Sequence, residues 1–229
     1  MITAEQVKYI FQDCDFTNLT SNNYDWKVLD ELSDKVKDYD WHVGATKLVV
    51  DLLDEDVIIK IPFCGQDYFT ETDEITEFDP FCSANYFVDM NSSEWDYCAT
   101  ECCIYDLAKN FRCGELAKLF AKEWFLCEVN GHPIYLQEKC KPLAPEKISF
   151  SYADKEASKY VDKTAKSMNV WHSDEWLVLV CHSFGKELFN TLLSFVKEYS
   201  INDIHSLNFG ENKDGMPCSF DYSGFNEIM

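Results

Sequence analysis

Three polar side chains near the end of the chain have types and a spacing that suit phosphoryl transfer. Asp203 is followed five residues later by Asn208, and thirteen residues after that by Asp221. In phosphoryl transfer, one carboxylate accepts the proton of an attacking hydroxyl, while an Asn and a second carboxylate hold metal against the nucleotide phosphates. Each residue type is also common in turns, so the interpretation depends on the order of the three together.

The elements around these residues are predicted to bring two of them together. Apolar residues at helical spacing predict a long helix over 173–199, shortly before Asp203. Asn208 begins a short strand, and Asp221 ends another that covers 217–220. The polar turn over 211–215 would join them, so we expect Asn208 and Asp221 to flank one hairpin, close in space. The stripe of the long helix expected to be buried consists of Trp176, Val180, Phe184, Leu188, Leu192, Phe195 and Tyr199.

A lysine in the middle of an apolar strand is costly to bury unless it meets anionic groups. Lys60 lies in the β-branched run 57–63, which is predicted to be a strand. Glu101 lies on the apolar face of a helix predicted over 94–108, and Glu94 lies two turns earlier on a similar face. Either carboxylate would pair with Lys60. Taken alone, Lys60 also fits a strand-edge lysine whose ammonium reaches solvent.

A capped helix, a bend and a hairpin complete the expected first half of the chain. Residues 3–11 are predicted to form a short helix that Thr3 caps, with Gln6 as the returning partner. Gly44 lies in a bend between two strands predicted within 41–52, where a glycine lets backbone amides approach a phosphate closely. An ordinary hairpin bend explains the same glycine. The Asn130-Gly131 pair predicts a tight turn between strands over 123–129 and 133–138, and the two prolines within 140–145 indicate a linker.

Together these motifs resemble the protein-kinase-like superfamily, and aminoglycoside and small-molecule phosphotransferases more than eukaryotic protein kinases. Residues 202–208 keep the D-x-H-x-x-N part of the catalytic loop, 57–60 resemble the V-A-I-K strand, and 221–224 resemble D-x-G with one additional residue. The resemblance implies an α+β, kinase-like bilobal fold. Residues 1–139 would form extension helices and an antiparallel-sheet N-lobe, and residues 140–229 a hinge and a minimal, mostly helical C-lobe.

The resemblance also implies an activity, which is ATP- and Mg²⁺-dependent transfer of the γ-phosphate to a hydroxyl acceptor, either a small molecule or a protein. Asp203 would act as the base. Lys60, paired with Glu101, would contact the α- and β-phosphates, and Asn208 and Asp221 would bind magnesium. The nucleotide would also meet Gly44 and the hinge backbone, of which the expected residues are Gln137, Glu138 and Cys140.

The chain departs from the family pattern in three ways, of which the thin glycine loop and the short C-terminal part favour an alternative. Ile201 stands where the family usually has His, and only Gly44 remains of the glycine-rich loop. Met229 follows Asp221 by eight residues, which leaves little chain for the part of the C-lobe that docks protein substrates. The alternative is a catalytically inactive pseudokinase that serves as a nucleotide-binding or protein-interaction module.

Charge and composition narrow the classes of partner. The 229-residue chain is 46% hydrophobic, which is typical of a folded protein, and its formal net charge is -21. Phosphates repel such a charge, so we expect no direct nucleic-acid binding and no association with anionic membranes. The charge alone also fits an acidic inhibitor or mimic that acts on a basic partner.

The cysteines and the N-terminus favour a cytoplasmic location. Eleven cysteines, none in a C-x-x-C pair, indicate buried thiols in a reducing compartment. The first residues lack the basic start and apolar run of a secretory signal, and no apolar segment is long enough to span a membrane.

Overall fold

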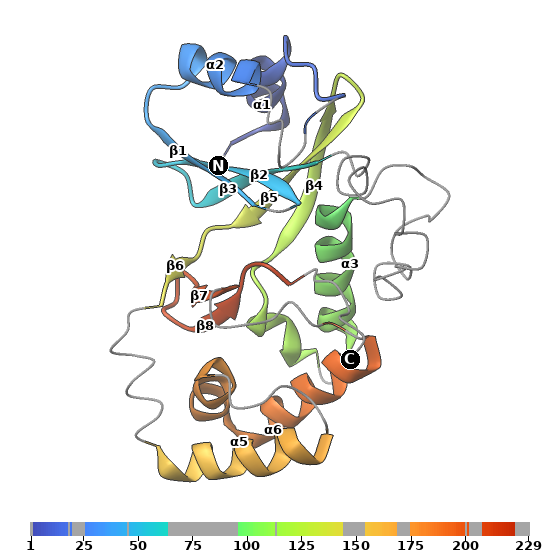
Figure 1. Cartoon of the computed structure of the whole chain (residues 1–229), viewed down its shortest axis with the longest axis vertical. Coiled ribbons are helices and arrows are strands. Elements are labelled where there is room, and N and C mark those ends of the chain that lie inside the picture. Colours follow the sequence, from blue (N-terminus) through green and yellow to red (C-terminus); the bar gives the residue numbers. More distant parts are fainter. Residues whose placement is uncertain are drawn as a thin grey trace, which may run out of the picture. The chain divides into compact units, whose positions relative to one another are not determined.

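The computed structural model shows a mixed α+β protein, as expected from the sequence (Figure 1). It describes residues 2–17, 19, 26–44, 46–63, 96–112, 114–143, 154–168, 175–199, 201 and 208–222. The chain forms two compact units. The first consists of Met1–Cys103 and Lys122–Lys139, and the second of Ile104–Ala121 and Cys140–Met229. The units therefore differ from the sequence-based division in that residues 104–121 belong to the second.

The first unit contains a five-stranded sheet in which every neighbouring pair is antiparallel. Its spatial order is β1-β2-β3-β5-β4, so β5 lies beside β3 rather than at an edge. Asn130 and Gly131 have φ angles of 51° and 82° and form the predicted tight turn between β4 and β5. The strands are β1 (Tyr39–Val43), β2 (Lys47–Leu52), β3 (Val57–Pro62), β4 (Glu123–Val129) and β5 (His132–Glu138).

One face of this sheet is apolar and packs against α1 (Ala4–Phe11) and α2 (Trp26–Lys35) (Figure 1). Side chains alternate between the two faces of a strand, so every second residue points into this core. The helix α1 begins with the predicted capping box, in which Gln6 N donates to Thr3 Oγ1 and Thr3 N donates to Gln6 Oε1. The buried strand residues of this core include Leu48, Val50, Leu52, Val57, Ile59, Ile61, Ile134 and Leu136.

The opposite face of the same sheet is polar. Register places Lys60 opposite Tyr135 and Glu123 opposite Gln137, so these four side chains share a face. Lys47 joins them from β2, two positions before Val49, the partner of Lys60. The polar face is met by the first part of α3 (Tyr97–Asn110), which spans the boundary between the units.

The second unit contains a three-stranded sheet of order β6-β7-β8 together with several helices. The linker predicted over 140–145 includes the short strand β6, which a two-residue pairing with β7 defines. The core includes stacked rings of Trp176 and Phe209, with centroids 5.1 Å apart. The elements are η4 (Glu115–Leu119), β6 (Lys141–Pro142), α5 (Lys155–Met168), α6 (Glu175–Tyr199), β7 (Phe209–Glu211) and β8 (Pro217–Ser219).

The long helix α6 is interrupted at Gly185, whose φ of 83° and ψ of 169° are not helical. The kink changes which residues face the core, so the predicted stripe holds only in part. Trp176, Val180, Leu192 and Phe195 are buried, while Phe184, Leu188 and Tyr199 are half-buried. Among the described residues, no helix has the length and apolar character needed to cross a membrane.

Candidate functional site

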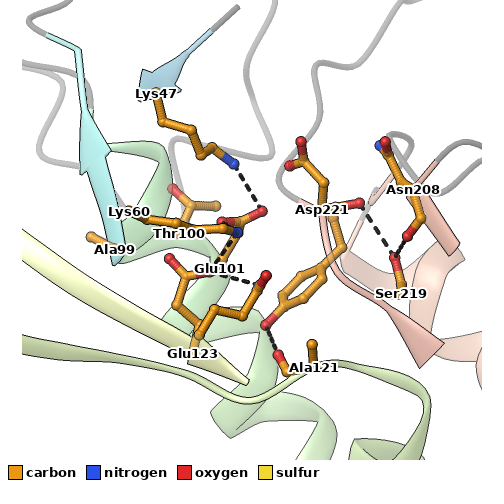
Figure 2. Close-up of polar contacts among 12 residues, drawn as sticks. Lys47, Lys60, Ala99, Thr100, Glu101, Ala121, Glu123, Asn208, Ser219 and Asp221 are labelled. Carbon is orange, nitrogen blue, oxygen red and sulfur yellow. Dashed lines mark hydrogen bonds and ion pairs between the residues drawn. The ribbon is translucent and has the colours of Figure 1, made fainter. Parts of the chain in front are cut away.

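The structure brings Lys60 and Glu101 together, as the sequence predicts. Lys60 Nζ lies 2.8 Å from Glu101 Oε2 (Figure 2). The helix α3 that carries Glu101 is capped by Asp96, whose side chain accepts a hydrogen bond from Ala99 N at 2.9 Å. Glu101 therefore lies just beyond the first turn of α3, facing β3. The rival carboxylate, Glu94, lies outside the described residues.

Two further charged residues belong to this group, and the sequence did not identify them. Lys47 Nζ lies 3.0 Å from Glu101 Oε1, and Lys60 Nζ lies 2.8 Å from Glu123 Oε2 (Figure 2). All four side chains are at most 3% exposed. We refer to Lys47, Lys60, Glu101 and Glu123 as the buried charge cluster. Alternation separates the two faces within β2 and within β4, but it is the register between strands that puts Lys47 and Glu123 on the face of Lys60.

The cluster binds a proton at Glu123 more readily than water-exposed carboxylates do. Burial raises the pKa of Glu123 well above its ordinary value, and the nearby Glu101 charge adds to the effect, while Lys60 opposes it. Gln137 Nε2 donates to Glu123 Oε2 at 2.9 Å. Within the described residues, Oε1 of Glu123 and Oε1 of Gln137 are buried and accept no hydrogen bond. A proton on Glu123 would relieve the repulsion between the two carboxylates.

One cysteine sulfur and two carboxylates in this region lie as close together as metal ligands do, but the carboxylates are already paired with lysines. One ligand atom each from Cys98, Glu101 and Glu123 lies within 4.8 Å of the others. Burial, followed by the charge of Glu123, raises the pKa of the Cys98 thiol well above its ordinary value, whereas a metal requires the thiolate. The same carboxylates already bind the ammonium groups of Lys47 and Lys60. The two lysines therefore account for these buried carboxylates without a divalent cation.

In the second unit, Asn208 and Asp221 flank the β7–β8 hairpin, as predicted. Phe220 N donates to the Asn208 carbonyl at 2.9 Å. Ser219 Oγ donates to the backbone carbonyls of Asn208 and Asp221, at 3.3 Å in each case (Figure 2). Both Asn208 and Asp221 are half-buried, and amide and carboxylate oxygens are ligands that suit Mg²⁺. Asp203, the expected base, lies outside the described residues.

The segment after β8 is held firmly, which fixes the backbone at Asp221. Tyr222 is fully buried, and its hydroxyl donates to the Ala121 carbonyl at 2.8 Å. The Tyr222 ring lies with its centroid 5.0 Å from that of Phe120. Ala121 N in turn donates to the Ser219 carbonyl at 2.7 Å, so β8 is tied to the chain beyond η4 on both sides of Asp221.

The segment expected to form the hinge that meets the nucleotide lies partly inside a strand. Gln137 and Glu138 lie inside β5, where they pair with Ile58 and Val57 of β3, and Glu138 N donates to the Lys122 carbonyl. The strand β5 ends at Glu138, as the predicted strand over 133–138 does, so Gln137 and Glu138 lie within the strand rather than in a hinge after it. Of the three expected hinge residues, Cys140 is the one that lies after the strand. Contact between this backbone and adenine stays a prediction.

Gly44 lies in the predicted bend. Gly44 N donates to the Lys47 carbonyl at 2.9 Å, which closes the turn between β1 and β2. An ordinary hairpin turn accounts for this geometry. The role of Gly44 toward phosphate therefore stays a prediction.

Comparisons with known proteins gave no assignment. A search of protein-family models found no match to this chain, and no curated protein or solved structure matches it.

Proposed function

We propose that the chain is an ATP- and Mg²⁺-dependent phosphotransferase with a kinase-like bilobal fold that acts in the cytoplasm. The observation that carries the proposal is the Lys60–Glu101 ion pair between β3 and the helix that follows it. In protein kinases a strand lysine paired with a helix glutamate must be in place for phosphoryl transfer. Lys60 would contact the nucleotide phosphates, and Glu101 would orient it.

The second unit supplies the other half of the expected chemistry. Asn208 and Asp221, at the open end of one hairpin, would hold magnesium, which when bound neutralises charge on the phosphates. Asp203 would accept the proton of the acceptor hydroxyl. The acceptor is a small molecule or a protein hydroxyl, and the net charge of -21 favours a cationic small molecule.

The test combines binding and transfer on the full chain. Thermal unfolding with and without ATP and Mg²⁺ is expected to show a magnesium-dependent rise in midpoint, because a ligand of the folded state stabilises it. Radiolabelled ATP is then offered with aminosugars, with a protein mixture and with the protein alone. Label transfer is expected, with at least a hundredfold loss in Asp203→Ala and Asp221→Ala.

Asp214→Ala is the matched control, because Asp214 is an exposed carboxylate in the turn of the same hairpin. It is expected to leave both binding and transfer unchanged. If ATP and Mg²⁺ produce no shift in the unfolding midpoint, or if Asp214→Ala loses as much transfer as Asp221→Ala, the proposal fails.

One observation favours a second candidate, a pseudokinase-like binding module. Lys60 donates to two buried carboxylates, Glu101 and Glu123, rather than to one. The second carboxylate competes with phosphate for the ammonium group and weakens phosphate contact. A thermal shift with nucleotide but no label transfer to any acceptor would support this module. Recovery of transfer in Glu123→Gln would instead show that Glu123 restrains an active enzyme.

A further inference from the structure

Two cysteines of the second unit bring their sulfurs together across a strand. Cys140 Sγ and Cys218 Sγ are 3.1 Å apart. Cys140 immediately precedes β6, Cys218 lies in β8, and β7 lies between these two strands in the sheet. A disulfide has a sulfur–sulfur distance of about 2.05 Å, so the two atoms need to move by only about 1 Å to bond.

A glycine on the intervening strand makes this approach possible. Gly210 of β7 pairs with Cys218 on one side and with Pro142 on the other. A Cβ atom at position 210 would lie 3.1 Å from Cys140 Cβ and 2.6 Å from the Lys141 carbonyl oxygen. Any other residue would therefore push the Cys140 segment away from β7. The absence of a side chain there lets the Cys140 side chain reach Cys218.

We propose that Cys140 and Cys218 are an oxidative modification site, at which a low-molecular-weight disulfide such as glutathione disulfide converts them to an intramolecular disulfide. The Cys140 thiolate attacks the glutathione disulfide, forms a mixed disulfide and releases one glutathione thiolate. The Cys218 thiolate then attacks the Cys140 sulfur and releases the second. The protein loses two electrons and two protons, and the glutathione disulfide gains them to become two glutathione molecules.

The different burial of the two thiols indicates which of them reacts first with the oxidant. Cys140 is half-buried and reachable by the oxidant, whereas Cys218 is buried and its sulfur lies beside that of Cys140. Burial raises the pKa of Cys98, Cys102, Cys127 and Cys181, which slows their attack on an oxidant because the thiolate is the attacking species. Cys218 is buried as well, but its sulfur needs to react only with the Cys140 sulfur, which lies 3.1 Å away. The inference does not rest on the proposed phosphoryl transfer.

The test uses the full chain, reduced and then exposed to glutathione disulfide at neutral pH. Intact mass spectrometry is expected to show the loss of two hydrogen atoms with no retained glutathione. Digestion without reductant is expected to yield one cross-linked peptide pair containing Cys140 and Cys218, which dithiothreitol separates. A mixed disulfide that persists at Cys140, a cross-link to another cysteine, or no reaction at either sulfur would overturn the proposal.

Two variants test the order of the steps, and a third serves as control. Cys218→Ser should accumulate glutathione on Cys140, and Cys140→Ser should react at neither position. Cys181→Ser removes a buried thiol of the same unit and is expected to cross-link as the unaltered chain does. If a variant fails to fold by circular dichroism, the peptide mapping of the unaltered chain still decides the outcome.

Discussion

The two faces of the first unit's sheet are built by the same strands and have opposite chemistry. On β3, Ile59 and Ile61 point into an apolar core under α1 and α2, while Lys60 between them points at buried carboxylates. Apolar burial stabilises the fold directly, at roughly 25 cal/mol per Å². A buried ion-pair network gives up hydration on every member and gains little net stability. The comparison shows that the apolar face supplies most of the stability of the sheet, while the charged face holds ionised groups in fixed positions. Buried charges held in this way are typical of functional sites.

Removing a single carboxylate from the charged face is expected to have the largest effect. Glu101→Ala leaves the ammonium groups of Lys47 and Lys60 buried with less compensation, so the free energy of unfolding should fall by about 3–5 kcal/mol. Urea denaturation measures it. The control is Glu115→Ala, which breaks the exposed pair with Lys118 and should change stability by less than about 1 kcal/mol. Equal effects would mean that the cluster is solvated.

Rebuilding the charged face as an apolar one is expected to have the opposite sign. The combined substitutions Lys47→Met, Lys60→Met, Glu101→Leu and Glu123→Leu should leave stability unchanged or raise it by about 1–4 kcal/mol, because no charge remains buried. Urea denaturation of the quadruple variant, together with ATP binding, gives the answer. We expect the quadruple variant to be as stable as the unaltered chain, or more so, and to have lost ATP binding. A loss of several kcal/mol would show that the cluster stabilises the face after all.

The pH dependence of stability sharpens the comparison, because the charged face contains a carboxyl group, Glu123, whose pKa is shifted by burial. The pKa of Glu123 is raised in the folded state by burial, so its contribution is fully present below the unfolded value of 4.5 and is lost as pH rises through the folded value. In that window, Glu123 lowers the free energy of unfolding by up to about 1.4 kcal/mol per pH unit.

Glu123→Gln removes this titration. Urea denaturation from pH 4.5 upward should therefore show the variant gaining stability relative to the unaltered chain as pH rises. A difference between the two proteins that is constant with pH would mean that Glu123 titrates as it does in water.

The apolar face should respond to a smaller change in proportion to burial. Ile59→Val removes one methylene from a fully buried site and should cost about 1 kcal/mol. Ile58→Val is the matched control, because Ile58 is only half-buried on the other face of the same strand. It should cost less than Ile59→Val. The reverse order in thermal unfolding would contradict the assignment of faces.

Features with a local cause could be predicted from the sequence. The capping box at Thr3 and Gln6 and the turn at Asn130-Gly131 depend on residues next to one another, and both are confirmed. The Lys60–Glu101 contact was predicted because a buried ammonium requires a carboxylate, and Glu101 was one of the two candidates named on the helix that follows the strand.

Features that depend on pairing between distant segments were not predictable. Lys47 and Glu123 join the cluster through strand register, which places residues far apart in sequence on one face. The strand β6 exists only because Lys141 pairs with Glu211. At Gly185, whose φ ends the helical geometry, the glycine itself was a sign against an unbroken helix, but the apolar periodicity continued through it and the predicted stripe passed the kink.

The division of the chain into discontinuous units sets the order in which a growing chain can complete its sheet. Synthesis adds residues from the N-terminus at about 5–20 per second. The strands β1, β2 and β3 emerge first, yet the other neighbour of β3 is β5, which follows a segment of the second unit. For several seconds on this scale, β3 is an edge strand whose unpaired backbone groups invite wrong partners. Lys60 lies on that edge, and a charge on an edge strand discourages association with another chain until Glu123 and β5 have been made.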